Sequence, residues 1–197
     1  EESGPQLAGR FARIGGKMDH VTLLEPFPIE TLVATIEKEK PNVAIIDSVQ
    51  TLTSSIQEGG PGTPSMIRYA TSLLLDLAKR SDTTILLIGQ ITKDGSIAGP
   101  KTLEHLVDVV LTLEGDPVHA YRILRATKNR FGATDEVGVF EMAPNGLVAV
   151  QNPSARFLKE RTSVPGSVVT AVMEGSRSFL VEIQALVEKS WFGMPIR

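Results

Sequence analysis

The chain has 197 residues, a formal net charge of −3, a hydrophobic share of 42% and no cysteine. These values fit a soluble globular protein with one modest core and an accessory piece, and they exclude a disulfide framework or a thiolate metal site within this sequence. No apolar run reaches about 18 residues, the length of a membrane span, so a cytoplasmic protein without membrane contact is expected.

The spacing of apolar residues alternates between helical and strand-like along the first half of the chain. Leu7, Phe11 and Ile14 have the spacing of an amphipathic helix. The elements expected after it are a short strand at 21–24, a helix at 29–40, a buried strand at 43–47, a polar loop at 54–64, a helix at 66–79 and a second buried strand at 83–89. Such alternation predicts an α/β sheet with right-handed crossovers.

Strands dominate the second half. A glycine-containing loop at 92–101 is followed by an expected short helix at 102–108, strands at 109–113, 121–127 and 137–143, a linker at 151–154, and strands at 167–173 and 179–186 around a turn at Gly175. The later strands are expected to continue the sheet as an antiparallel edge. The change in composition near residue 150 divides the chain into domains at 1–150 and 151–197.

Asp47 is the first candidate site residue because it ends the continuous apolar run Val43–Ile46. Open α/β sheets bind ligands at the carboxyl ends of their strands. Together with Ser48, a carboxylate at that position has the form of an element that holds the magnesium of a nucleotide. The alternative is that Asp47 only caps the loop that follows it.

Two further polar features follow later strands. Gln90 stands at the corresponding end of the next strand, where a neutral amide can sense a γ-phosphate or be an ordinary strand-end residue. Lys128 and Arg130 lie in Lys128-Asn129-Arg130-Phe131-Gly132, directly after another strand. Two such cations can stabilise the charge of phosphoryl transfer, or they can form a solvated surface turn.

Two long polar segments are candidate DNA contacts. The first, 54–69, has Arg68 near its end, and the second, 92–105, contains Lys93, Lys101 and His105 among glycines. Loops longer than about 12 residues without structure of their own are usually functional or disordered. Their amides and lysines can follow the phosphates of a single strand without reading sequence; mobile surface loops are the alternative.

Several segments in order resemble the RadA (Sms) family of bacterial DNA-repair proteins. They are Glu1-Glu2-Ser3 with Gln6-Leu7, the Walker B strand at 45–51, the second DNA loop at 92–101 with 103–105, the signature pentapeptide at 128–132, and the entry to a Lon-protease-like domain at 157–161 and 164–167. The pentapeptide is the most specific of these matches, and together they cover nearly the whole chain.

The resemblance implies an α/β, RecA-like P-loop NTPase core, with a mostly parallel sheet and helices on both faces, followed by the start of a Lon-like α/β domain. It implies an ATPase that moves on single-stranded DNA and extends recombination intermediates by branch migration, as a DnaB-like hexameric ring working with the RecA recombinase. ATP or ADP and magnesium are the cofactors that this activity requires.

Site roles follow from the resemblance residue by residue. Glu1 polarises the attacking water, and Asp47 holds magnesium through water, next to Ser48. Gln90 takes the place of a polar sensor that is more often His in the family. The remaining roles are contacts to the nucleotide of the neighbouring subunit by Lys128 and Arg130, and contacts to DNA by Arg68, Lys93, Lys101 and His105.

The sequence also departs from the family pattern. It contains no G-x-x-x-x-G-K-[ST] phosphate loop, and the glycine-rich segment Gly59–Thr63 lacks a Lys and follows the Walker B strand instead of preceding it. The four-cysteine zinc finger of the family is absent, so no zinc is expected here. The Lon-like part stops after its first hairpin, without the segment for a Ser-Lys dyad, so no protease is expected.

Two interpretations account for these departures. The first is that the sequence is part of a longer, active protein, truncated on its N-terminal side; we favour it because both ends fall inside recognisable units and because a sheet without its phosphate-loop strand exposes apolar edges. The second is a degenerate homologue without ATPase activity. On that alternative the chain is a non-hydrolysing module that binds DNA or assembles rings.

Overall fold

The computed structural model describes residues 4–16, 18–25, 27–90, 103–115, 121–159, 161 and 164–186. The chain divides into two compact units, Glu1–Val110 and Leu111–Arg197, and each is described by itself. No helix in the described part of the chain is both long and apolar enough to cross a membrane.

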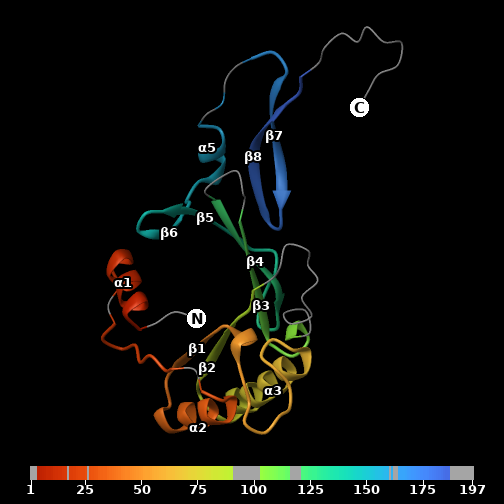
Figure 1. Cartoon of the computed structure of the whole chain (residues 1–197). Helices are drawn as coiled ribbons and strands as arrows, with labels where there is room; N and C mark the ends of the chain where they lie inside the picture. The colour runs from red at the N-terminus through yellow and green to blue at the C-terminus, as the bar shows by residue number, and fades with distance from the viewer. Residues whose placement is uncertain are drawn as a thin grey trace, which may run out of the picture. The chain divides into compact units, whose positions relative to one another are not determined.

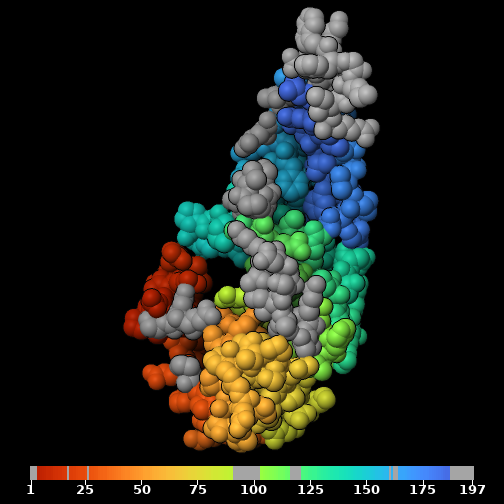
Figure 2. All heavy atoms as spheres, turned by 45° about the vertical axis from the view of Figure 1, so that its right-hand side comes forward, coloured from red at the N-terminus to blue at the C-terminus, as the bar shows by residue number. Residues whose placement is uncertain are grey.

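The first unit is built on a parallel pair of strands. Its elements in order are α1 (Gly4–Ile14), α2 (Ile29–Glu39), β1 (Val43–Asp47), the 3-10 turn η1 (Val49–Thr51), α3 (Pro64–Arg80) and β2 (Thr84–Ile88). Strands β1 and β2 pair in parallel from Val43 opposite Thr84 to Asp47 opposite Ile88. Helices α2 and α3 lie side by side (Figure 1), and the residues from α2 through α3, orange to yellow in Figure 2, form one compact mass.

Local signals explain where these helices begin and end. Thr63 caps α3 by accepting a hydrogen bond from the Met66 backbone, and Pro64 occupies the first turn. Helix α2 ends at Glu39 and is capped by Lys40, whose φ of 49° lies in the left-handed region, and Pro41 cannot continue the helix. The core between the helices and the sheet is apolar and includes Ile29, Val33, Ile36, Ile46, Val49, Ile67, Ala70, Leu74 and Leu77.

The sequence prediction for this unit is wrong in two details. Residues 21–24 are not a strand, and Val21, Leu23 and Leu24 are 41%, 43% and 45% exposed. An apolar run becomes a strand only where a neighbouring strand takes its backbone hydrogen bonds, and none does so within the described ranges. The β1 strand is also not buried on both faces, because Val43 and Ile45 are 53% and 63% exposed.

The second unit contains a four-stranded sheet and a hairpin. The sheet has the order β3 (Val109–Gly115, which begins at the boundary of the unit), β4 (Tyr121–Asn129), β5 (Val137–Ala143) and β6 (Gly146–Ala149). The hairpin consists of β7 (Ser167–Glu174) and β8 (Arg177–Gln184), which are antiparallel. Among the described residues the later strands thus form sheets of their own, whereas the sequence predicts an extension of the β1–β2 sheet.

A short helix, α5 (Pro153–Phe157), stands where the sequence predicts a linker. Asn152 caps it by accepting a hydrogen bond from the Ala155 backbone at 3.0 Å. The Phe157 ring meets Tyr121 of β4 edge-on, with 5.4 Å between ring centroids, and lies 6.2 Å from the Phe179 ring of β8. The helix therefore ties the hairpin to the β3–β6 sheet inside one compact unit, and the predicted domain boundary near residue 150 stays a prediction.

Candidate functional site

The candidate site lies at the edge of the β1–β2 sheet where both parallel strands end. Asp47 is the last residue of β1 and pairs with Ile88, the last residue of β2; Gln90 follows two residues later. The Asp47 side chain is exposed, and no other part of the described chain forms a hydrogen bond or ion pair with its carboxylate. Asp47 and Gln90 thus share the edge at which α/β sheets bind ligands.

A buried turn fixes the backbone that follows Asp47. Ser48 and Val49 are each only 1% exposed. Thr51 donates its backbone N–H and its hydroxyl to the carbonyl oxygen of Ser48, at 3.1 and 2.9 Å. Ser48, which the resemblance places at the nucleotide, is therefore part of the anchor, while Asp47 presents its carboxylate to solvent from a fixed position.

Gln50 links this turn to the end of the second strand. Its side-chain amide nitrogen donates to the backbone carbonyl oxygen of Gln90 at 3.0 Å. Its side-chain oxygen is buried and has no partner in the described part of the chain. Gln50 thereby connects the segment after Asp47 with the residue that precedes 91–102, a segment that lies outside the described residues.

Glu30, in the first turn of α2, organises the start of the first candidate DNA loop. One carboxylate oxygen accepts hydrogen bonds from the Ser54 hydroxyl and from the Tyr69 hydroxyl of α3, the latter at 3.2 Å. The other accepts from the Ser55 backbone N–H at 3.1 Å and from the Ser55 hydroxyl at 3.2 Å. Ser54 in turn accepts from the backbone N–H of Gln57 at 2.8 Å.

These contacts change the acidity of both groups. Partial burial alone raises the pKa of Glu30, but the hydrogen bonds from Ser54, from its own backbone and from Ser55 outweigh this effect and lower the pKa from 4.5 to about 2. Burial and the neighbouring Glu30 carboxylate raise the pKa of Tyr69. Glu30 is therefore an ionised clamp on the loop at neutral pH, and sequence reasoning missed it because its partners lie 24 to 39 residues away.

Arg68 lies on α3, just after the first candidate DNA loop. Its neighbours Met66, Ile67 and Ala70 are fully buried, whereas Arg68 is exposed. The helix therefore directs this cation to solvent. His105 is exposed as well and follows Leu103 and Glu104, which are helical. Of the other residues that sequence reasoning selects, Glu1, Lys93 and Lys101 lie outside the described residues.

The basic pentapeptide forms a turn at the end of β4, in the second unit. Asn129 holds this turn, because its side-chain oxygen accepts from the Phe131 backbone at 3.0 Å and its amide nitrogen donates to the carbonyl oxygen of Ala133 at 3.3 Å. Lys128 is half-buried and Arg130 is exposed. The two cations thus lie on either side of Asn129, the residue that holds the turn.

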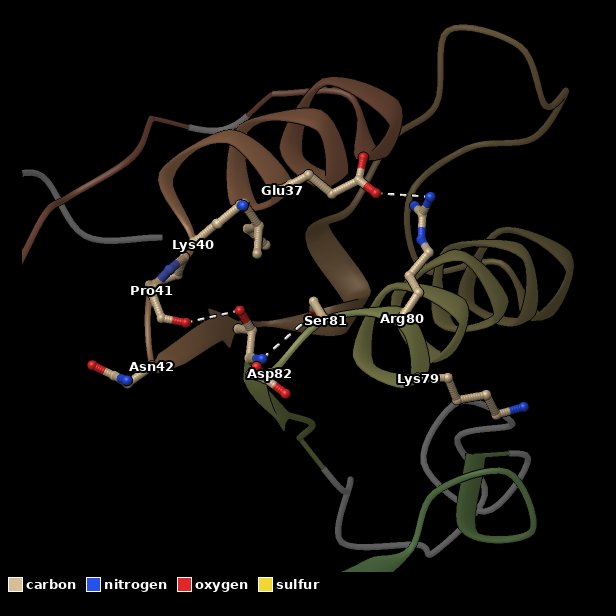
Figure 3. A pocket seen from close by; sticks show the side chains of 10 residues that line it. Glu37, Lys40, Pro41, Asn42, Lys79, Arg80, Ser81 and Asp82 are labelled. Atoms are coloured by element: carbon tan, nitrogen blue, oxygen red, sulfur yellow. Dashed lines mark hydrogen bonds and ion pairs between the residues drawn. The ribbon is translucent and has the colours of Figure 1, made fainter.

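A hollow of about 620 Å³ opens at the other end of the β1–β2 sheet, where the strands begin. Figure 3 shows the Glu37–Arg80 ion pair, with 2.7 Å between its charged atoms, on one side of it. The hollow is lined by Ile36, Glu37, Lys40, Pro41, Asn42, Lys79, Arg80, Ser81, Asp82 and Thr83. The side chains that line the hollow include both acidic and basic groups, and none of the predicted site residues lies there. We therefore assign the functional site to the opposite edge of the sheet, where β1 and β2 end.

Comparisons with known proteins give the family. No protein-family model matches the chain. The DNA repair protein RadA of Pseudomonas aeruginosa is 46% identical over 198 residues, covering 100% of this chain and 44% of that protein. RadA of Bacillus subtilis is 45% identical over 198 residues, covering 100% of this chain and 43% of the relative.

A solved structure of an ATPase domain is similar in fold. It has a TM-score of 0.53 with 12% sequence identity and covers 63% of this chain and 52% of its own. This likeness concerns the fold alone, and it confirms the RecA-like α/β core that the sequence predicts. From the identity along its whole length, the chain belongs to the RadA family, of whose curated members it spans a little less than half the length.

Proposed function

We propose that the protein to which this chain belongs is an ATP-dependent DNA-repair motor of the cytoplasm. In this proposal it acts as a hexamer on single-stranded DNA and recombination intermediates, driving branch migration together with a RecA-type recombinase. The observation that carries the proposal is the exposed carboxylate of Asp47 at the carboxyl edge of β1–β2, the edge that Gln90 shares, in a chain of the RadA family.

The donor set suits a magnesium nucleotide held mainly through water. The described residues contain no cluster of three or more His, Cys, Asp or Glu side chains that could enclose a metal, so Asp47 is a single anionic contact. Magnesium keeps several of its waters and commonly binds one or two carboxylates together with substrate phosphates. Bound there, magnesium would neutralise charge on the phosphates during their transfer.

The remaining site residues have distinct roles in this proposal. Gln90 senses the terminal phosphate, and Glu1 orients the attacking water. The cations Lys128 and Arg130 reach across a subunit interface to the nucleotide. On the DNA side, backbone phosphates are contacted by Arg68, Lys93, Lys101 and His105, which bind without reading sequence.

The decisive experiment compares two aspartates in the protein at its natural length. Asp47→Asn removes the carboxylate at the candidate site, whereas Asp82→Asn changes a carboxylate at the opposite end of the same sheet. ATP hydrolysis stimulated by single-stranded DNA is expected to fall by at least about 100-fold in the Asp47 variant, because a ligand of the metal–phosphate complex is lost, and to stay unchanged in the Asp82 variant. Equal hydrolysis by the two variants would refute the assignment.

A second candidate function is a module that binds DNA or assembles rings without hydrolysing ATP. This candidate concerns the 197-residue polypeptide itself, whose sequence contains no G-x-x-x-x-G-K-[ST] loop, the element that supplies the backbone cradle and the lysine for phosphates. Titration of the 197-residue polypeptide with labelled ATP and with single-stranded DNA separates the two. Magnesium-dependent binding of ATP by this polypeptide, followed by its hydrolysis, would rule out the second candidate.

A further inference from the structure

The β7–β8 hairpin contacts the loop that follows the basic pentapeptide. Its two-residue tip, Gly175-Ser176, lies against Asp135, three residues after Gly132. The Ser176 backbone N–H donates to the carbonyl oxygen of Asp135 at 2.8 Å, and its hydroxyl donates to the same oxygen at 3.2 Å. Ser176 and Asp135 are 41 residues apart in sequence and lie in the same compact unit.

The contact requires a glycine. Gly175 has a φ of 59°, in the left-handed region, and a Cβ added to it would collide with the carbonyl oxygen of Asp135. Any other residue at 175 would therefore push the tip away from the loop. Gly175 therefore serves two purposes: its positive φ lets the chain reverse direction, and its lack of a Cβ lets the hairpin tip approach Asp135.

Two arginines reinforce the contact from either side. Arg177, at the start of β8, donates from Nη1 to the carbonyl oxygen of Val137 at 3.2 Å. Arg125 of β4, paired in register with Val137, forms an ion pair with Glu174 at the end of β7 and a second one with Glu114 of β3 at 3.5 Å. The hairpin tip is thus fixed to both strands that flank the 130–136 loop.

The loop itself has two attachment points. Asn129 fixes its beginning through Phe131 and Ala133, and the hairpin tip fixes its end through Asp135. Lys128 and Arg130 lie at the first attachment point. A short loop held at both ends has few conformations left, so releasing one end also loosens the turn that carries the two cations.

We propose that the tip of the β7–β8 hairpin is a positioning element for the basic turn Lys128–Gly132, so that the segment after residue 150 takes part in ATP turnover through the Asp135 contact. The inference rests on the proposed function for the role of the cations, and on the contacts above for the positioning. Neither Gly175 nor Ser176 touches the reacting groups in this proposal.

The experiment uses the protein at its natural length and compares Gly175, at the tip of the hairpin, with Gly166, directly before β7. Gly175→Ala forces a Cβ into the Asp135 carbonyl. Gly166→Ala is the matched control, because Gly166 also has a positive φ, 89°, and its Cβ would collide with the carbonyl oxygen of Ala185 at the other end of the hairpin. Arg177→Met is a milder variant that removes the bond to Val137 and leaves the turn glycine in place.

Two measurements test the inference. Amide hydrogen exchange of residues 130–136 is expected to speed up about tenfold in Gly175→Ala and less in Arg177→Met, but not in Gly166→Ala. For ATP hydrolysis stimulated by single-stranded DNA, kcat is expected to fall about tenfold in Gly175→Ala with little change in KM, as when an interaction made in the transition state is lost.

The outcomes are distinguishable. Unchanged exchange at 130–136 in Gly175→Ala, or equal losses of kcat in the two glycine variants, would overturn the inference. So would faster exchange with normal kcat while Lys128→Ala abolishes turnover, because positioning by the hairpin would then be unnecessary. If Gly175→Ala speeds up exchange and both Gly175→Ala and Lys128→Ala have normal kcat, the proposed function of the turn is wrong, and so is the hairpin's part in turnover. The faster exchange would then show only that the hairpin tip contacts the loop.

Discussion

Gln50 donates its side-chain amide to the backbone carbonyl of Gln90 across 3.0 Å, joining the ends of two parallel strands. One partner belongs to the turn that Asp47 opens, and the other precedes the second candidate DNA loop. If the proposed roles of the two segments are right, this hydrogen bond is a direct link between the nucleotide site and the DNA loop through a single side chain. Sequence patterns give Gln50 no role, since it is an ordinary polar residue in the segment Val49–Thr51.

Replacing Gln50 with Leu is expected to reduce the stimulation of ATP hydrolysis by DNA more than the basal rate. The substitution removes the donor to Gln90, which costs about 1 kcal/mol of folding free energy for one hydrogen bond, and it breaks the side-chain link between the segments that follow the two strands. ATPase assays with and without single-stranded DNA measure the effect, and denaturant unfolding measures the cost. Gln151→Leu is the control, because Gln151 is exposed and lies outside the candidate site and both candidate DNA segments; a parallel loss of basal and stimulated rates in Gln50→Leu would contradict the coupling.

Glu30→Gln is expected to destabilise the protein by about 1 kcal/mol at neutral pH and to expose the Ser54–Gln57 segment to proteolysis. The loss is that of charge-assisted hydrogen bonds at a half-buried position, where solvent screens part of the interaction. Glu39→Gln, at the exposed end of the same helix, is the control and is expected to change neither stability nor proteolysis. If the protease cleaves wild type and Glu30→Gln at the same rate, Glu30 does not hold the Ser54–Gln57 segment in place.

The contribution of Glu30 also has a definite pH dependence. Its pKa is about 2 in the folded protein and 4.5 as a free group, so the folded state binds its proton more weakly than the unfolded state does. The stabilisation is therefore complete above pH 4.5 and is lost as the pH falls through 4.5 towards 2. Unfolding free energies of wild type and Glu30→Gln are expected to differ at about pH 6 and to converge as the pH approaches about 2; a constant difference would show that the charge of Glu30 is not involved.

Two substitutions of Asn129 in the pentapeptide are expected to lower the kcat of ATP hydrolysis to different degrees. Asn129→Asp keeps the acceptor for the Phe131 backbone but loses the donor to Ala133, whereas Asn129→Ala loses both. The kcat of DNA-stimulated ATP hydrolysis is expected to follow the order wild type, Asp, Ala, with about a tenfold loss for Ala. Circular dichroism should show native folding in both variants, and an Ala variant as active as wild type would mean that the turn geometry does not matter.

Much of the first unit can be predicted from sequence, because its elements depend on local signals. The apolar run ending at Asp47 and the capped, amphipathic α3 follow from residue order alone. The apolar pattern of residues 21–24 predicts a strand, but strand formation depends on a partner elsewhere in the chain. The sequence does not predict helix α5, because its Phe157 packs against Tyr121 and Phe179, which lie far from it in sequence.

The site is predictable only at the strand ends. Asp47 and Gln90 are expected to lie together because carboxyl ends of parallel strands meet at one edge, and their roles stay predictions. The clamp by Glu30 and the contact between the hairpin tip and Asp135 join segments 24 to 41 residues apart. Periodicity and spacing carry no information on such pairings, which depend on how the elements pack.

The salt dependence of binding to single-stranded DNA is expected to separate Arg68 from Arg80, the other arginine of α3. Arg68 is exposed beside the first candidate DNA loop, whereas Arg80, at the far end of the same helix, is paired with Glu37 at 2.7 Å. Arg68→Ala is expected to weaken binding of single-stranded DNA by a similar factor for all sequences and to reduce the slope of log affinity against log salt by about 0.7, the value for one phosphate contact on a single strand. Arg80→Ala is expected to leave the slope unchanged. Fluorescence anisotropy titrations at several salt concentrations measure both slopes, and identical slopes for Arg68→Ala and wild type would place the DNA path elsewhere on the molecule.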